Sequence, residues 1–305
     1  MSENVNRFLS KINSTPTATN LANYTTYRIG GVSKLFLAPK TIKEAEFMFK
    51  TALEEKIKVF VLGGGSNLLI NDEEDITFPI IYTGCLNKIT LQGNKITAEC
   101  GTNFENLCNF ALENELSGLE FIYGIPGTLG GAIWMNARCF GSEISEILDL
   151  VFFVDENGQT ICKKFERNDF SYKISPFQKK NILILKATLN LSKGNGIHIL
   201  NIMKQNKQNR IDRGHYLFPS SGSTFKNNKK FLKPTGKIIE ECNLKGLKIG
   251  EAFVSPHHGN FIINKNNARA RDIKALIERV KTEVKIKTGF SLEEEVLYIG
   301  FKDKT

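Results

Sequence analysis

The sequence predicts a mixed α/β protein of two or three domains. Its 305 residues suffice for more than one core, because single cores stop growing beyond roughly 250–300 residues. Residues 41–44 have the pattern of a helix capping box, and apolar residues follow at helical spacing to about residue 56. An apolar strand at 58–62 then ends in a glycine loop, an order typical of a small α/β lobe.

The rest of the chain continues this alternation. Residues 102–114 predict a helix with a buried stripe, and residues 268–289 predict the clearest helix, with Gly289 suited to its C-cap. The other expected elements are strands within 76–96, a mostly loop segment at 118–131, strands at 148–154, 159–164 and 181–191 with a hairpin turn at 156–158, a linker at 192–196, a helix at 197–209, a loop-rich segment at 210–234 and a strand at 292–300.

Composition and charge narrow the class of protein. Hydrophobic residues make up 41% of the chain and charged residues 24%, as in ordinary soluble proteins, and neither a membrane span nor a signal peptide is expected. The six cysteines form no C-x-x-C pair, which favours buried free thiols in a reducing cytoplasm. The net charge of +9 comes from residues 201–305, which favours an anionic ligand there. Nucleic acid and a simple lysine bias are the alternatives.

Two glycine-rich segments point to a phosphorylated ligand. Gly63, Gly64 and Gly65 follow the strand at 58–62, and residues 124–136 carry four more glycines. Without Cβ atoms the backbone can approach a ligand closely and direct several N–H groups at phosphate oxygens. Neither a dinucleotide-binding fingerprint nor a Walker A loop is present. One such segment alone is as well explained by a tight turn, whereas two favour an extended diphosphate.

Seven motifs in order resemble one family. They are Thr26–Gly31, Gly63–Leu69, Gly118–Glu120 leading into Ile125–Thr128 and Asn136, Phe170–Ser175, Gly222–Asn227, Val254–Ser255 with His258 and Asn260, and Leu292–Val296. With these motifs, residues 25–300 resemble the UDP-N-acetylenolpyruvoylglucosamine reductase (MurB) family of peptidoglycan synthesis.

The resemblance implies an α+β fold. It consists of a two-lobe FAD-binding module of the vanillyl-alcohol-oxidase (PCMH) type and a smaller α/β substrate-binding domain. The implied divisions are 1–75 for lobe 1, 76–195 for lobe 2, with the FAD-binding region at about 28–192, and 196–305 for the substrate domain. The resemblance also implies non-covalent FAD, NADPH as hydride donor, a UDP-sugar substrate, a cytoplasmic location, a role in cell wall synthesis and cell division, and a monomer that binds neither nucleic acid, metal nor membrane.

The resemblance further assigns roles to residues. The flavin N5 delivers hydride to an enolpyruvyl ether, and Ser223 matches the proton donor, Glu295 the catalytic glutamate and Lys173 the site of the anionic intermediate. The implied cofactor-binding residues are Arg28, Gly63, Gly64, Gly65, Ser66, Asn67, Pro126, Gly127, Thr128, Gly130, Gly131 and Asn136. The implied substrate-binding residues are Tyr172, Arg213, Lys226, Asn227 and His258.

Lys173 departs from the family pattern, which has arginine at this position. Lysine keeps the positive charge but loses the planar fork that binds a carboxylate through two hydrogen bonds. Read without the resemblance, Ser223 is a turn residue of a Ser/Gly-rich loop, Glu295 an exposed charge in an acidic run and Lys173 a surface lysine.

Two other functions stay open at this point. A flavoprotein oxidase of the same fold with another substrate would keep the glycine segments but would not need Ser223 and Glu295. A nucleic-acid-binding protein would use the basic residues 201–305, but that region lacks the interleaved aromatic residues of a stacking surface.

Overall fold

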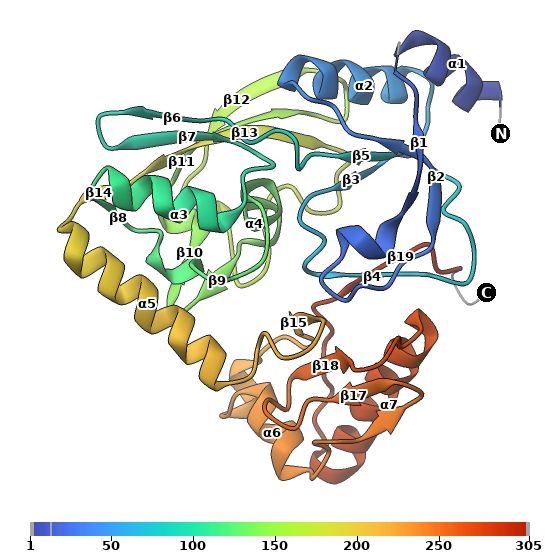
Figure 1. Cartoon of the computed structure of the whole chain (residues 1–305), viewed down its shortest axis with the longest axis vertical. Coiled ribbons are helices and arrows are strands. Elements are labelled where there is room, and N and C mark those ends of the chain that lie inside the picture. Colours follow the sequence, from blue (N-terminus) through green and yellow to red (C-terminus); the bar gives the residue numbers. More distant parts are fainter. Residues whose placement is uncertain (1–2, 13, 303–305) are drawn as a thin grey trace. The chain divides into compact units, whose positions relative to one another are not determined.

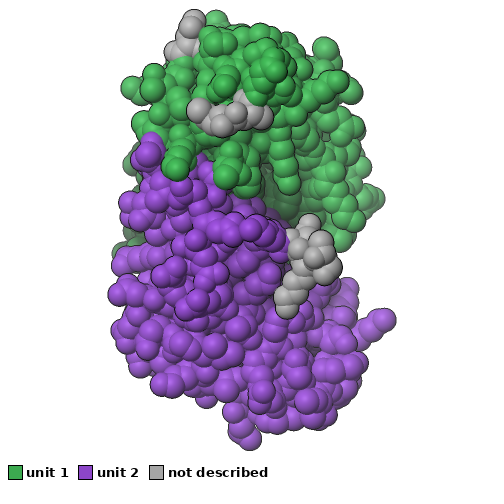
Figure 2. All heavy atoms as spheres, turned by 90° about the vertical axis from the view of Figure 1, so that its right-hand side faces the viewer, with its two compact units in different colours: residues 1–17, 34–64, 77–208 green, residues 18–33, 65–76, 209–305 purple. Residues whose placement is uncertain are grey.

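The computed structural model describes residues 3–12 and 14–302, which form two compact units (Figure 2). Unit 1 comprises residues 1–17, 34–64 and 77–208, and unit 2 comprises residues 18–33, 65–76 and 209–305. Each unit is therefore assembled from segments that are far apart in the sequence. The predicted division into three domains at 75/76 and 195/196 stays a prediction.

Unit 1 is built on a five-stranded antiparallel sheet. Its strands, in order across the sheet, are β12 (Thr160–Lys164), β11 (Leu148–Val154), β13 (Leu183–Asn190), β7 (Lys95–Glu99) and β6 (Ile89–Gln92). Helix α2 (Ile42–Glu54) lies on one face of this sheet, and α3 (Phe104–Glu113) and α4 (Leu129–Met135) lie on the other (Figure 1). Their apolar faces enclose a core that includes Phe49 and Leu107.

A smaller parallel group of strands leads to the first glycine loop. Strand β5 (Ile80–Tyr82) pairs in parallel with β2 (Val32–Leu37) and with β3 (Phe60–Leu62), and β3 ends one residue before Gly63. The remaining elements of residues 3–12 and 14–208 are α1 (Glu3–Lys11), β1 (Thr17–Asn20), η1 (Leu21–Tyr24), β4 (Leu68–Ile70), β8 (Leu116–Ser117), η2 (Glu120–Ile122), β9 (Arg138–Cys139), β10 (Ser142–Glu143), η3 (Ile144–Glu146), η4 (Arg167–Asp169), β14 (Ser192–Lys193) and α5 (Gly196–Asp212), which continues to residue 212.

Unit 2 contains a four-stranded antiparallel sheet covered by a long helix. The sheet order is β15 (Ser220–Ser223), β18 (Phe261–Asn264), β17 (Ala252–Val254) and β16 (Lys248–Ile249). Helix α7 (Ala270–Thr288) packs on β16, β17 and β18, beside α6 (Thr235–Glu241), and η5 (Lys229–Phe231) precedes α6. The predicted apolar stripe of α7 is buried, and Gly289 has the left-handed φ of 76° that its C-cap requires.

A parallel pair of strands joins the two ends of unit 2 in sequence. Strand β4 pairs with β19 (Leu297–Ile299), so that Leu68 lies opposite Leu297. The core of unit 2 accordingly includes Tyr27 and Leu69 along with residues of α6 and α7.

Several local predictions need correction. Residues 118–131 were expected to be mostly loop, but they contain η2 and the start of α4, and the expected strand at 292–300 is limited to β19. The expected linker at 192–196 begins with β14, which pairs with β8. The capping box is half formed, because the Thr41 hydroxyl accepts from Glu44 N, whereas the Glu44 carboxylate accepts from Lys40 N instead of Thr41 N.

All six cysteines are free thiols, but only half of them are buried. Cys100, Cys108 and Cys242 are buried, Cys139 is half-buried, and Cys85 and Cys162 are exposed. Burial raises the pKa of Cys100 to about 12, so this thiol is protonated and unreactive at neutral pH.

Candidate active site

The two glycine-rich segments meet in unit 1. A Cβ atom built on Gly64 would lie 3.0 Å from the Cα of Gly127, and one built on Gly63 would lie 2.6 Å from Thr128 Oγ1. Glycine at both positions therefore lets the two segments approach this closely without displacing a neighbour. We call Gly63, Gly64, Gly127 and Thr128 the glycine cradle.

Polar atoms without partners line the second half of the cradle. The hydroxyl oxygens of Thr102 and Thr128 are buried and have no hydrogen-bond partner within residues 3–12 and 14–302. Backbone bonds hold the segment in place, from Leu129 N to Thr102 O at 2.9 Å and from Gly130 N to Cys100 O at 2.8 Å. Because buried hydroxyl groups are nearly always paired, the cradle fits a ligand that supplies hydrogen-bonding atoms.

The chain passes from unit 1 to unit 2 between Gly64 and Gly65, so the predicted loop is divided. In unit 2, Gly65 has φ 59°, and a Cβ there would lie 1.8 Å from the Tyr24 carbonyl oxygen. Thr26 N donates to Gly65 O at 3.2 Å, and Arg28 sits in the same turn with φ 55°. Ser66 and Asn67 are half-buried. Asn67 Nδ2 donates to Glu295 O at 2.9 Å, which ties this loop to a predicted catalytic residue.

Lys173 lies at the tip of a tight hairpin in unit 1. Ser171 and Ile174 exchange two backbone hydrogen bonds of 3.1 and 3.0 Å, and Lys173 between them has φ 60°. The neighbouring Tyr172 ring faces the guanidinium of Arg138 at 5.9 Å. Lys173 is one of ten non-glycine residues with a positive φ in the described part of the chain, and its role with substrate stays a prediction.

Asn136 caps α4 and connects it to this hairpin. Its Nδ2 donates to Ser171 O at 3.0 Å, and its Oδ1 accepts from Ser145 N at 3.3 Å. The side chain is buried, and its amide already donates one hydrogen bond and accepts one within the protein. A cofactor contact by Asn136, which stays a prediction, would have to use its second N–H. Pro126, Gly130 and Gly131 lie in or next to the turn that opens α4.

Ser223 and Glu295 lie on neighbouring segments of unit 2. Glu295 N donates to Thr224 O and Lys226 N donates to Glu293 O, each at 2.8 Å, and Phe225 lies opposite Glu294 in an antiparallel bridge. These bonds bring together two residues that are 72 positions apart in the chain.

The other acidic residues of this segment are engaged in ion pairs. The Glu294 carboxylate accepts from Lys281 Nζ at 2.6 Å and from the Tyr298 hydroxyl, and Glu293 pairs with Lys226 Nζ at 2.5 Å. The positive charge of Lys226, a predicted substrate-binding residue, is thus partly compensated within the protein.

Asn260 holds the segment that follows Ser223 through both the oxygen and the nitrogen of its side-chain amide. Phe225 N donates to Asn260 Oδ1 at 2.9 Å, and Asn260 Nδ2 donates to Phe225 O at 2.8 Å. The Nδ1 atom of His258 accepts from Asn260 N at 3.2 Å, and the Oδ1 atom of Asn227 accepts from Thr235 N at 2.8 Å at the start of α6. His258 and Asn227 therefore have structural partners besides their predicted role with substrate. Asn260 lies in one of the seven motifs, but its residue type does not indicate which backbone groups its amide bonds.

The half-buried rings of His215 and His258 pack against the buried ring of Phe261. Its ring centroid lies 4.4 Å from that of Phe261 and 5.5 Å from that of His258. Both ring nitrogens of His215 are buried without a hydrogen-bond partner in the described part of the chain. Burial lowers the pKa of His215 to about 3, and the positive charges of Arg210 and Arg213 act in the same direction.

The His215 group predicts a pH-dependent stability. The folded chain keeps His215 neutral down to pH of about 3, whereas the unfolded chain binds a proton below 6.5. Between pH of about 3 and pH 6.5 the unfolded state therefore binds more protons than the folded state. The free energy of unfolding is constant above this range and falls as the pH decreases through the range. The pKa of His258 is lowered in the same way. We expect His215→Phe to make the decrease shallower in urea unfolding measured from pH 7 to pH 4.

His198→Phe is the control for this experiment, because His198 is exposed at the start of α5. It should leave the pH profile of stability as in the wild type. An equally steep decrease in His215→Phe would show that other groups cause it.

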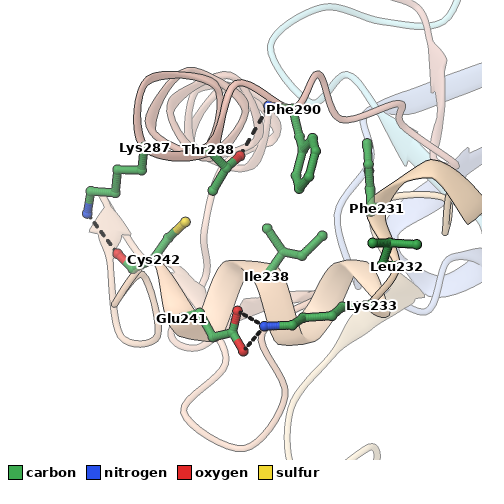
Figure 3. Close-up of a pocket in the computed structure, with 9 residues that line it drawn as sticks. All are labelled: Phe231, Leu232, Lys233, Ile238, Glu241, Cys242, Lys287, Thr288 and Phe290. Atoms are coloured by element: carbon green, nitrogen blue, oxygen red, sulfur yellow. Dashed lines mark hydrogen bonds and ion pairs between the residues drawn. The ribbon is translucent and has the colours of Figure 1, made fainter.

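One cavity of about 360 Å³ lies in unit 2, between α6 and the end of α7 (Figure 3). The rings of Phe231 and Phe290 stack 4.6 Å apart on one side, and Cys242 lies on the other. Among the residues that line it, Lys233 forms an ion pair with Glu241, and Lys287 donates a hydrogen bond to Cys242 O. None of the predicted site residues lines this cavity.

Within residues 3–12 and 14–302, no three His, Cys, Asp or Glu side chains are grouped so that they could hold a metal ion. No helix in the same residues combines the length and apolar character needed to cross a membrane.

Comparisons with known proteins agree with this layout. A family model described as FAD binding domain matches residues 33–162, and one described as UDP-N-acetylenolpyruvoylglucosamine reductase, C-terminal domain, matches residues 213–299. A UDP-N-acetylenolpyruvoylglucosamine reductase of Borreliella burgdorferi is 68% identical over 302 residues, covering 99% of this chain and 100% of that protein. The reductase of Treponema denticola is 41% identical, covering 90% of each chain.

A solved structure gives the same result. The crystal structure of UDP-N-acetylenolpyruvylglucosamine reductase (MurB) from Thermus caldophilus has a TM-score of 0.77 and 31% identity, covering 93% of this chain and 98% of that chain. The predicted α+β fold, an FAD-binding module with a smaller substrate domain after it, is confirmed.

The fold and the glycine cradle together define an FAD-dependent oxidoreductase. Its Cβ-free backbone and the unpaired hydroxyl groups of Thr102 and Thr128 fit a cofactor that carries phosphate and sugar oxygens. The chain belongs to the UDP-N-acetylenolpyruvoylglucosamine reductase (MurB) family, whose enzymes act in the synthesis of peptidoglycan precursors.

Proposed function

We propose that this enzyme reduces the enolpyruvyl ether of UDP-N-acetyl-enolpyruvoylglucosamine to the lactyl ether of UDP-N-acetylmuramate. Bound FAD would supply the hydride to one alkene carbon, after taking it from NADPH. The other carbon must then receive a proton, and the negative charge that develops next to the substrate carboxylate must be stabilised.

Three residues of the chain would do this work. Ser223 delivers the proton from its hydroxyl group. Glu295 forms a hydrogen bond with the substrate carboxylate or with the enolate, and Lys173 offsets the negative charge of the anionic intermediate. A serine hydroxyl is a weak acid, so Ser223 must be held within reach of the carbon that receives the proton. Asn260 and Glu295 fix the backbone that follows it by three hydrogen bonds of 2.8–2.9 Å.

The observation that carries this proposal is the pairing of the Ser223 and Glu295 segments within one unit. An oxidase with another substrate would not need the proton donor and the carboxylate that we assign to these two segments. The same segments lie inside the match to the family's C-terminal domain. We further propose that Arg28, Gly65, Ser66 and Asn67 join the glycine cradle in holding FAD, and that Arg213, with Tyr172, meets the anionic substrate.

An anaerobic titration tests the reaction. NADPH is expected to bleach the oxidised flavin absorbance, and enolpyruvyl-UDP-GlcNAc is expected to restore it in a stoichiometric amount. UDP-GlcNAc, which lacks the alkene, is the matched control and should restore nothing. Recovery that occurs only when oxygen is admitted would replace the proposal with the oxidase alternative.

The setting of the enzyme belongs to the same proposal. A substrate activated by UDP places the reaction in the cytoplasm, and we propose that the enzyme is a monomer. Size-exclusion chromatography with light scattering would measure the molar mass directly. A stable dimer would overturn this part alone.

A further inference from the structure

We propose that Gln178 is a positioning residue for the reaction, because its amide fixes the backbone carbonyl of Lys173 and thereby sets the direction of the Lys173 side chain. The inference rests on the proposed function in one respect, namely that Lys173 meets the anionic part of the substrate. The contacts that carry it all lie within unit 1.

The Gln178 amide nitrogen has two strong acceptors for its two N–H groups. Its Nε2 atom donates to Lys173 O at 3.0 Å and to Trp134 O at 3.1 Å, and Met135 Sδ lies 3.9 Å away as a weak third acceptor. A primary amide has two N–H groups, so the side chain is fully used as a donor. It forms a bridge between the Lys173 hairpin and the last turn of α4.

Other side chains hold the hairpin to α4 without reaching Lys173. Asn136 donates to Ser171 O at 3.0 Å, and the Ser175 hydroxyl donates to Trp134 O at 2.7 Å. Among the hydrogen bonds described for this hairpin, those of Asn136 and Ser175 fix its two ends, and that of Gln178 fixes the residue at its tip.

The location of α4 gives this bridge its meaning. The helix begins at Leu129, directly after the Gly127 and Thr128 positions of the glycine cradle, and it has only seven residues. Gln178 therefore links Lys173 to the end of the same short helix whose start forms the cradle. A lysine held at φ 60° needs such support, since the surrounding structure must impose this conformation.

Gln178→Glu is the sharpest test, because it keeps the volume of the side chain and removes both N–H donors. A carboxylate facing two carbonyl oxygens would be repelled, and the hairpin tip would move. A displacement of about 1 Å at a reacting group can cost about 100-fold in rate, so we expect kcat for enolpyruvyl-UDP-GlcNAc reduction to fall 10- to 100-fold. FAD content and the rate of flavin bleaching by NADPH should stay at the wild-type level.

Two comparisons separate positioning from a general structural effect. Gln92→Glu makes the same chemical change at an exposed position of β6 and should leave kcat unchanged. In a double-mutant cycle, Gln178→Glu should add nothing to the loss caused by Lys173→Gln, because Gln178 acts through Lys173. Additive losses in this cycle would overturn the inference.

Hydrogen exchange in the FAD-free protein gives a readout that needs no turnover. We expect amides 171–174 to exchange faster in Gln178→Glu than in the wild type, with the exchange of β13 unchanged. Unchanged exchange at 171–174, or a wild-type kcat in Gln178→Glu, would overturn the positioning role while leaving the proposed function intact. A wild-type enzyme that cannot reduce enolpyruvyl-UDP-GlcNAc would overturn the proposed function, and with it this role for Gln178.

Discussion

Replacement of Ser223 by alanine is expected to slow the reduction of enolpyruvyl-UDP-GlcNAc by about 10²- to 10⁴-fold, the range typical of losing a positioned acid or base. The loss should fall on the step that consumes substrate, so bleaching of the flavin by NADPH should proceed at the wild-type rate. Stopped-flow absorbance can measure the two half-reactions separately. The half-buried Ser223 side chain lies at the end of β15, next to the Thr224 carbonyl that accepts from Glu295 N.

Ser221→Ala is the matched control for this variant. Ser221 is in the same strand, and a hydrogen bond between its hydroxyl and Tyr27 partly offsets the rise in the pKa of Tyr27 that burial causes. Its removal takes a partner from the buried Tyr27 hydroxyl, so some stability should be lost, but both half-reactions of the flavin should proceed at the wild-type rate. A Ser223→Ala enzyme that restores the flavin absorbance as fast as Ser221→Ala would exclude Ser223 as the proton donor.

Replacement of Gly64 by valine should impair FAD binding. The new Cβ would meet the Gly127 backbone at 3.0 Å, so the two halves of the glycine cradle would have to separate. Overpacking of this kind typically costs about 1–3 kcal/mol, which corresponds to a roughly 5- to 150-fold weaker affinity if it falls on the bound state. The FAD content of the purified protein and a titration of the FAD-free protein with FAD both measure this.

Gly196→Ala serves as its control. Gly196 opens α5, and the nearest atom to a Cβ built there is 3.7 Å away, which is an ordinary contact. FAD content should be unchanged in this variant. Equal FAD content in Gly64→Val and Gly196→Ala would remove the first glycine loop from the cofactor site.

The periodicity of apolar residues sufficed to predict helices that bury an apolar stripe over several turns. Helix α7 has an apolar stripe of several turns, and its predicted core residues Ile273, Leu276 and Val280 are all buried. Helix α4 escaped prediction because two of its seven residues are glycine, which disfavours helix. It is held by tertiary contacts instead, such as the bond from Gly130 N to Cys100 O. Helix α1 could have been expected from the spacing of Val5, Phe8 and Ile12, which are buried.

The candidate site likewise has residues that a local sequence pattern marks and residues that only tertiary contacts reveal. Ser223, Glu295 and the glycine segments lie in motifs that the sequence displays, and the structure adds how their backbones are held together. The positions of Asn260 and Gln178 matter through hydrogen bonds across 35 residues in one case and 5 and 44 residues in the other. Asn260 lies in a motif that the sequence displays, but neither its residue type nor that of Gln178 indicates which distant backbone groups it bonds.

The pairing of β4 with β19 has a consequence for the order in which the protein can form. Residues 18–33 and 65–76 leave the ribosome early, but the strand and the helices that complete their core lie beyond residue 209. Until these are synthesised, apolar residues such as Tyr27 and Leu69 lack their packing partners, so we expect the nascent chain to be prone to aggregation. A fragment that starts at residue 209 lacks residues 18–33 and 65–76 of its own unit, so we expect it to be insoluble.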